Sequence, residues 1–204
     1  MKFKSVIAVL ALIASSAANA SLISNGSFEA PGIQSGWTYL SDNSNGWQGD
    51  NIEVWRSGFN GVTSYEGNQH GELNAHPHDG TSFSIYQTFA TTANSTYAYS
   101  LAYRARSNND ESFRLEIFTG DLNNRDHVVN FEFIDHTTRE WSTFASSFIG
   151  SGFNTYFMLT SVNPTAATVG NFIDAVVVND VSAPTSIALL GIALAGLISV
   201  RRRA

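Results

Sequence analysis

The feature that most constrains the fold of this chain is a period-two alternation of large apolar side chains in short runs. In one run, Tyr97, Tyr99, Leu101 and Tyr103 share one face, and the run Phe113 to Thr119 repeats the pattern. Successive side chains of a β-strand point to opposite faces, so this spacing predicts strands with one buried face. The central part of the chain has no persuasive 3.6-residue periodicity, and we therefore predict an all-β domain.

Nine runs of this kind are separated by turn sequences such as Asn45-Gly46, Asn60-Gly61 and Asp79-Gly80. The predicted strands are residues 37–40, 52–55, 82–89, 96–103, 113–119, 127–134, 141–149, 156–162 and 171–178. This number and spacing of strands favour a β-sandwich. The chain has no Cys, but a domain of this size buries a sizeable core without disulfides.

The first 20 residues have the three parts of a secretory signal peptide. Lys2 and Lys4 give the positive start, Val6 to Ile13 is a short apolar run, and Ala18-Asn19-Ala20 places small residues at the cleavage site. The alternative is an amphipathic first helix of the domain, which the lack of a polar face disfavours. We therefore predict that residues 1–20 direct export.

A second apolar run, Ile187 to Val200, is followed at once by Arg201, Arg202 and Arg203. The run is short for a bilayer-spanning helix, which needs about 17–25 residues. The positive-inside rule would place the arginines on the cytoplasmic side and the rest of the chain outside. The alternative is a buried C-terminal helix, and the adjoining arginines argue against it.

Residues 181–204 resemble a PEP-CTERM sorting tail, because a short motif, an apolar segment and a basic cluster follow each other in that order. This chain has the variant motif Ser182-Ala183-Pro184 in place of Pro-Glu-Pro. The resemblance implies processing by an exosortase, a membrane transpeptidase-like enzyme, with the apolar helix as a transient membrane anchor. It also implies a bacterial protein of the cell surface or extracellular matrix.

Between the two ends, the chain is strongly acidic. Residues 21–180 contain all 17 acidic residues, six arginines and no lysine, a formal charge of −11. Such a surface repels phosphate backbones, so we exclude nucleic acid as a partner. Divalent cations and neutral polar molecules suit this charge better.

Residues 21–180 also resemble the galactose-binding-like jelly rolls, a superfamily with many carbohydrate-binding modules. The segments that carry the likeness are Leu22 to Glu29, Tyr65 to Asn74, Ile85 to Phe89 and Gly170 to Val178. The resemblance implies a jelly-roll β-sandwich.

In such jelly rolls, an acid after the first aromatic residue and the Asp of the last strand often hold a structural calcium ion. The matching positions here are Glu29 and Asp174. Calcium binds 6–8 oxygen ligands in a flexible geometry, so carboxylates suit it. The alternative is that Glu29 caps a turn and that Asp174 pairs with an arginine.

Carbohydrate sites commonly combine an exposed aromatic ring with Asn, Asp, Gln or Arg. Trp47 and Trp55 lie in a polar, Gly-rich region that also holds Asn51 and Arg56, so these four residues are our candidate ligand site. The alternative is that the tryptophans belong to the core, since aromatic residues dominate sandwich interiors. If the site is right, Trp55→Ala weakens glycan binding and leaves the fold intact.

Three histidines, His70, His76 and His78, lie within nine residues beside Glu72 and Asp79. The pair His76 and His78 would suit zinc or copper, but their spacing fixes no third ligand. A stretch rich in Pro and Asp-Gly is typical of a surface loop, and loops often carry binding residues. We therefore add His76 and His78 to the candidate ligand site.

Evidence for catalysis in the sequence is thin. The central region has no Cys or Lys, which excludes thiol and Schiff-base mechanisms, and Gly-x-Ser-x-Gly is absent. No spacing picks out a carboxylate pair for glycoside hydrolysis. We therefore predict a non-catalytic glycan-binding protein of the extracellular polysaccharide or biofilm matrix. The alternatives are a structural or adhesive protein that binds other proteins, and a glycoside hydrolase on the same scaffold.

Overall fold

The computed structural model describes residues 20–41, 43, 45–77, 79–165 and 168–181, which form one compact unit, Ala20–Val181. The predicted signal peptide lies outside the described residues except for Ala20, and the predicted sorting tail does so except for Val181. Within the described ranges, no helix is long and apolar enough to cross a bilayer. The apolar run Ile187 to Val200 is not part of those ranges.

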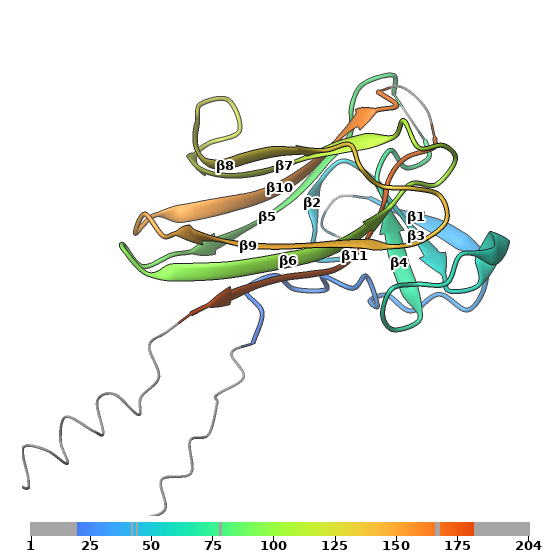
Figure 1. Cartoon of the computed structure of the whole chain (residues 1–204), viewed down its shortest axis with the longest axis horizontal. Helices are drawn as coiled ribbons and strands as arrows, with labels where there is room; N and C mark the ends of the chain where they lie inside the picture. Colours follow the sequence, from blue (N-terminus) through green and yellow to red (C-terminus); the bar gives the residue numbers. More distant parts are fainter. Residues whose placement is uncertain (1–19, 42, 44, 78, 166–167, 182–204) are drawn as a thin grey trace, which may run out of the picture. The chain divides into compact units, whose positions relative to one another are not determined.

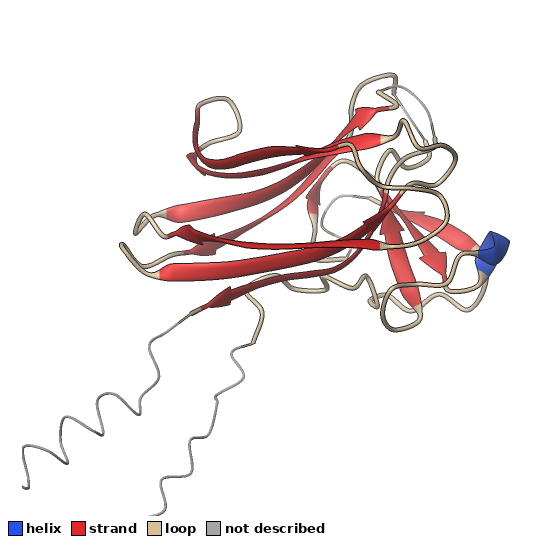
Figure 2. Ribbon diagram, viewed as in Figure 1, coloured by secondary structure: helices blue, strands red, loops and turns tan. Residues whose placement is uncertain are grey.

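The described residues fold into two antiparallel sheets that pack face to face (Figures 1 and 2). Sheet A contains, in spatial order, β1 (Trp37–Leu40), β3 (Ile52–Arg56), β4 (Gln69–Glu72), β11 (Phe172–Asp180), β6 (Thr96–Arg104) and β9 (Ser142–Ile149). Sheet B contains β2 (Gln48–Gly49), β5 (Ser84–Ala90), β10 (Asn154–Asn163), β7 (Ser112–Gly120) and β8 (Arg125–Phe133). One 3-10 turn, η1 (Phe59–Gly61), follows β3.

The strand order is that of a jelly roll. Strands β4 to β11 form two four-stranded halves, β4-β11-β6-β9 and β5-β10-β7-β8, and these are the eight strands of a double-sheet jelly roll. Strands β1 and β3 extend sheet A beyond β4, and β2 extends sheet B beyond β5. The predicted all-β jelly-roll sandwich is therefore confirmed.

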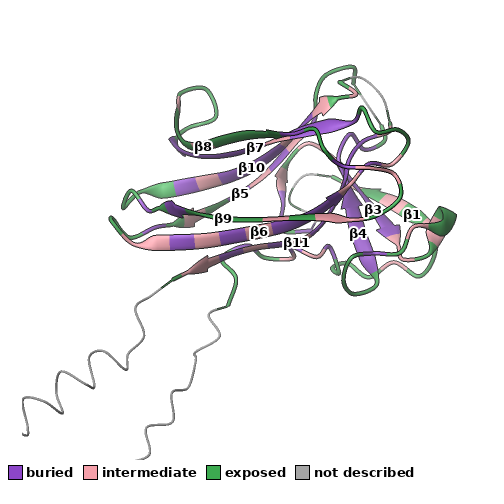
Figure 3. Ribbon diagram, viewed as in Figure 1, coloured by how far each residue is buried: buried purple, intermediate pink, exposed green. Residues whose placement is uncertain are grey.

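The core lies between the sheets and follows the predicted alternation. Tyr97, Tyr99, Leu101 and Tyr103 of β6 are all buried against sheet B, and Figure 3 shows the buried bands along the strands. Aromatic rings also stack within one sheet: Phe113 of β7 pairs with Phe133 of β8, and their rings are 4.7 Å apart and nearly parallel. Further core residues are Ile52, Val54, Ile85, Leu115, Ile117, Phe133, Phe148, Phe157, Leu159, Ile173 and Val178.

All nine predicted strands are present, with ends that differ by at most two residues. Two strands were not predicted, β2 and β4. Strand β4 has the sequence Gln-His-Gly-Glu, and Gln69, His70 and Glu72 are all buried. A strand whose buried side chains are polar carries no hydrophobic alternation, so the pattern could not reveal it.

Candidate functional site

The outer face of sheet A, which points away from the core, carries the candidate site. The antiparallel pairing of β1, β3 and β4 aligns Trp37, Trp55 and His70 in one row across the strands. The same pairing aligns Tyr39, Glu53 and Glu72 in a second row. Residues that pair directly share a face, so both rows lie on the same side of the sheet.

Exposed aromatic rings gather at the β1 edge of this face. Trp37 and Tyr39 are 42% and 46% exposed, and His76, in the loop after β4, is also exposed. The His76 ring contacts both in edge-to-face geometry, with centroids 6.4 Å from Trp37 and 6.0 Å from Tyr39. We call Trp37, Tyr39 and His76 the aromatic platform.

Glu53 connects the loop that carries His76 to the sheet. Its carboxyl group is buried, and Oε1 accepts a hydrogen bond from the His76 backbone N–H at 2.9 Å. Oε2 accepts a second bond from the indole N–H of Trp55 at 3.0 Å. One carboxyl group therefore fixes both the loop that carries His76 and the ring that lies beside Trp37.

Two strands away from β1, on β4, lies an ion pair whose carboxylate is buried and whose arginine is partly exposed. Glu72 Oε1 accepts hydrogen bonds from Arg106 Nη1 at 2.7 Å and from the Gly170 N–H at 2.8 Å. Burial raises the pKa of Glu72 well above its usual range, and the Arg106 charge opposes that rise. The Arg106 guanidinium also lies 4.6 Å from the centre of the Trp55 ring, a cation–π contact.

The prediction that Trp47 and Trp55 stack on a sugar is wrong. Both are only 2% exposed, so neither presents a ring face to solvent. Trp47 stacks on Phe28 with ring centres 5.7 Å apart. Trp55 packs against Phe59 and Phe172, at 5.0 and 5.1 Å. The alternative assignment of both tryptophans to the interior is the correct one.

The other predicted ligand residues lie near the platform or outside the described part. Asn51 and Arg56 are half-buried. Asn51 precedes β3 and Arg56 is its last residue, whose backbone N–H donates to the Gly36 carbonyl at 2.9 Å. His76 belongs to the platform itself, whereas His78 lies outside the described residues. The aromatic platform therefore lies in the predicted region of the surface, but two of its three rings come from residues that were not predicted.

His70 is not in a surface loop. It is fully buried in β4, and its Nδ1 lies 2.9 Å from the Ser64 hydroxyl oxygen. Burial, and secondarily the charge of Arg104, lowers the pKa of His70 to about 3. Among the described residues, no three His, Cys, Asp or Glu side chains are grouped as metal ligands.

Glu29 and Asp174, the predicted calcium ligands, hold the same loop. Glu29 Oε1 accepts the N–H groups of Asn68 and Gln69 at 2.6 and 2.9 Å. Asp174 is fully buried, and its Oδ2 accepts the Glu66 N–H at 3.1 Å. Burial raises the pKa of Asp174 to about 7, and no arginine within the described ranges pairs with it.

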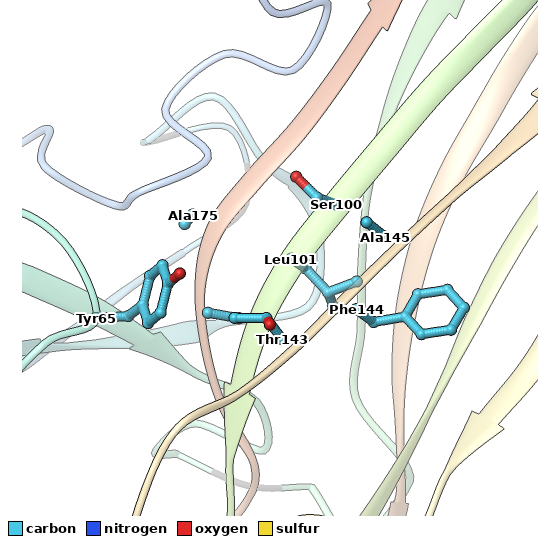
Figure 4. A pocket seen from close by; sticks show the side chains of 8 residues that line it. Tyr65, Ser100, Leu101, Thr143, Phe144, Ala145 and Ala175 are labelled. Carbon is cyan, nitrogen blue, oxygen red and sulfur yellow. The ribbon is translucent and has the colours of Figure 1, made fainter.

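A shallow hollow lies farther along the same face of sheet A, over β11, β6 and β9 (Figure 4). Its volume is about 250 Å³. The residues that line it from the outer face of the sheet are Tyr65, Ser100, Ala102, Thr143, Ala145 and Ala175, of which Ala102 is fully buried. Leu101 and Phe144 contribute only from below, since both pack in or against the core.

The sequence analysis did not assign Trp37, Tyr39 or Tyr65 to the site. For Trp37 and Tyr39, one signal was available: they are two residues apart in a predicted strand, so they share the face opposite Leu40. Tyr65 lies in a loop, and no pattern in the sequence marks it.

The chain was compared with known proteins. No family model matches it, and no curated protein matches it. The solved structures include TmCBM61 in complex with β-1,4-galactotriose, with a TM-score of 0.49, 16% identity, and 79% of this chain and 99% of that chain covered. The CBM22-1 xylan-binding domain of Paenibacillus barcinonensis Xyn10C has a TM-score of 0.47 and 17% identity, over 78% and 93%.

An enzymatically active domain is also among the similar structures. The tailspike protein 4 domain of bacteriophage CBA120 has a TM-score of 0.49 and 15% identity, over 79% of this chain and 21% of that chain. At these identities, the comparisons concern the fold alone. A shared fold does not imply a shared function, which depends on the residues at the surface of this chain.

Proposed function

We propose that this jelly roll is a non-catalytic glycan-binding domain and that the aromatic platform is its binding site. The observation that carries the proposal is the pair of exposed rings, Trp37 and Tyr39, held in contact with His76. Large exposed rings that are grouped in one place, rather than scattered singly over the surface, are typical of a binding site.

The platform has the two kinds of contact that a sugar needs. A sugar ring has an apolar C–H face, which packs on an aromatic plane, and hydroxyl groups at its rim. Because β1 is an edge strand of sheet A, backbone N–H and C=O groups on its outer side pair with no other strand in the described part of the chain. These groups, together with Tyr39 and His76, supply hydrogen bonds to hydroxyl groups beside the rings.

The charge of the domain favours uncharged polysaccharides over acidic ones. Residues 21–180 have a formal charge of −11, which repels acidic polysaccharides. We therefore propose a neutral polysaccharide as the ligand.

The buried acids support binding rather than hydrolysis. Glu53 and Glu72 face each other, but both are almost fully buried and hold structural contacts. A glycosidase needs two carboxyl groups that reach the scissile bond. In this site, neither carboxyl group reaches the surface on which a sugar would lie.

We also propose that Glu29 and Asp174 hold a calcium ion. Both are oxygen donors that converge on the loop 65–69, and Asp174 is buried without an arginine partner in the described part of the chain. Oxygen donors of this kind suit calcium. A bound cation would neutralise a buried carboxylate in a strongly acidic domain and stabilise the loop that carries Tyr65.

For the two ends of the chain, the proposal rests on sequence. We propose that residues 1–20 direct export, and that an exosortase processes the tail with Ser182, Ala183 and Pro184, its apolar run and its arginines. The domain would then act at the cell surface or in the extracellular matrix. Fractionation of the producing cells tests this: the intact chain in the cytosol would contradict it.

The experiment for the binding function is a screen of the full chain, kept in detergent because of its apolar run, against neutral and acidic polysaccharides. We expect retention on a subset of neutral polysaccharides without release of reducing ends. Release of reducing ends would identify a hydrolase. Binding to no polysaccharide, together with capture of a defined protein partner, would support the structural or adhesive alternative instead.

A further inference from the structure

The hollow over β11, β6 and β9 exists because the side chains around it are short. Ser100 pairs with Ala145, and Ala102 pairs with Thr143, across the two antiparallel strands β6 and β9. All four face outward, opposite the core residues Leu101 and Tyr103. Longer side chains at these positions would fill the hollow, so its volume is set by the choice of residues.

Tyr65 forms one wall of the hollow (Figure 4) and is held in place from behind. It is 49% exposed, and its ring contacts Trp141 edge-to-face at 6.3 Å. The Trp141 indole N–H donates to the Thr63 carbonyl at 2.8 Å, and the next backbone N–H after Tyr65 is held by Asp174. An exposed ring fixed in this way needs little further ordering when a ligand arrives.

The polar groups around the hollow are hydroxyls with free hydrogen-bonding capacity. Within the described ranges, the hydroxyl groups of Tyr65, Ser100 and Thr143 have no hydrogen-bond partner. Among the residues that the structure describes, no charged side chain lines the hollow, and its floor is formed by Ala145 and Ala175 with the buried Ala102 beneath. An aromatic wall, an apolar floor and three free hydroxyls match a ligand with one apolar face and several hydroxyl groups.

We propose that this hollow is a second sugar-binding site, which takes a single uncharged sugar ring of the same polysaccharide that binds the platform. The proposal rests on the proposed function of the domain. In sheet A, the platform strand β1 and the hollow strand β6 are separated by β3, β4 and β11, which is roughly 19 Å at about 4.8 Å per strand. Two sites on one face bind a polymer more tightly than either binds a short oligosaccharide.

The test fills the hollow with a side chain. Ala145→Leu places a larger side chain into the hollow. Because Ala145 is at an exposed position of β9, we expect the fold to be unchanged. The matched control is Ser147→Leu, which adds the same side chain to the same face of the same strand, two residues farther on and outside the hollow. Thr143→Val is a second variant, which removes one hydroxyl and keeps the shape.

The measurement is calorimetric titration of each full chain with a short oligosaccharide of the polysaccharide found in the screen, and with the polymer. We expect two oligosaccharides bound per wild-type chain and per Ser147→Leu chain, but one per Ala145→Leu chain. For the polymer, Ala145→Leu should lose about tenfold or more in affinity. Thr143→Val should weaken the second site and keep the first.

The outcomes separate the two proposals. If the wild type binds one oligosaccharide, if Trp37→Ala abolishes this binding and if Ala145→Leu leaves it unchanged, the hollow is not a sugar site and the platform stands. If the wild type binds no polysaccharide, the proposed function itself fails. Loss at Ala145→Leu and Ser147→Leu alike would show a general effect of the added side chain and would overturn the assignment of the hollow.

Discussion

Glu53 and Glu72 lie opposite each other on the adjacent strands β3 and β4, with both carboxyl groups buried on the outer face of sheet A. Each holds a different part of the site. Glu53 binds the backbone of His76 and the indole of Trp55, while Glu72 binds Arg106 and the backbone at Gly170. The paired strands β3 and β4 therefore connect the loop that carries His76 to the loop before β11.

Glu53→Gln should destabilise the domain and weaken glycan binding together. The amide keeps one acceptor oxygen but places an NH₂ group against a donor, either the His76 N–H or the Trp55 indole. A buried donor left without an acceptor costs about 1–3 kcal/mol. Urea unfolding measures the loss. The control is Glu132→Gln. Glu132 and its partner Arg114 are both exposed, so the free energy of unfolding should change by less than about 1 kcal/mol.

Trp55→Ala should destabilise the domain by about 3–5 kcal/mol, because it removes a buried ring packed against Phe59 and Phe172. Trp37→Ala, at an exposed edge position, should cost less than about 1 kcal/mol. Denaturant unfolding of both variants compares them directly. Equal losses of stability would contradict the assignment of Trp55 to the interior and of Trp37 to the surface.

His70 should make the domain sensitive to acid. Burial lowers its pKa to about 3, against about 6.5 in an unfolded chain. The stability that neutral His70 contributes is therefore fully present above pH 6.5 and is lost as the pH falls from 6.5 towards 3, by up to roughly 4 kcal/mol. In His70→Phe, the free energy of unfolding should fall less between pH 7 and pH 4. Identical slopes in wild type and variant would contradict this account.

Calcium should raise the melting temperature of the full chain. If the ion binds Glu29 and Asp174 only in the folded state, excess calcium over chelator should shift the transition upward by about 5 °C or more. Glu29→Gln should reduce this shift, and Glu132→Gln, on the exposed face of β8, should leave it unchanged. The same melting temperature in chelator and in calcium would overturn the proposed metal site.

Much of the fold could be predicted from the sequence, because burial between two sheets imposes a strict alternation. Tyr97 to Tyr103 shows that pattern, and the structure confirms it. Strand β4 escaped prediction because its side chains are buried through polar contacts. Gln69 and Glu72 bind residues far away in the sequence, and His70 contacts Ser64, six residues earlier. The alternation of apolar residues indicates which apolar side chains are buried, but it gives no information about buried polar side chains.

The candidate site was harder to predict because the neighbouring strands and loops determine which side chains on a face of the sheet are covered. Trp55 and Trp37 pair across β1 and β3 and share a face. Trp55 is covered by Phe59 and Arg106, whereas Trp37, on the edge strand, is covered by neither. Only the strand order and the course of the loops decide this difference, and neither can be derived from the spacing of aromatic residues.

In our proposal, the aromatic platform binds a neutral glycan. The most direct measurement is calorimetric titration of wild type, Trp37→Ala and Phe153→Ala with the polysaccharide found in the screen. Phe153 is the matched control, since it is 71% exposed and, in the turn between β9 and β10, lies outside both proposed sites. The account predicts about a 30-fold or larger loss of affinity for Trp37→Ala, as for a central contact residue, and no change for Phe153→Ala. Unchanged binding by Trp37→Ala would contradict it.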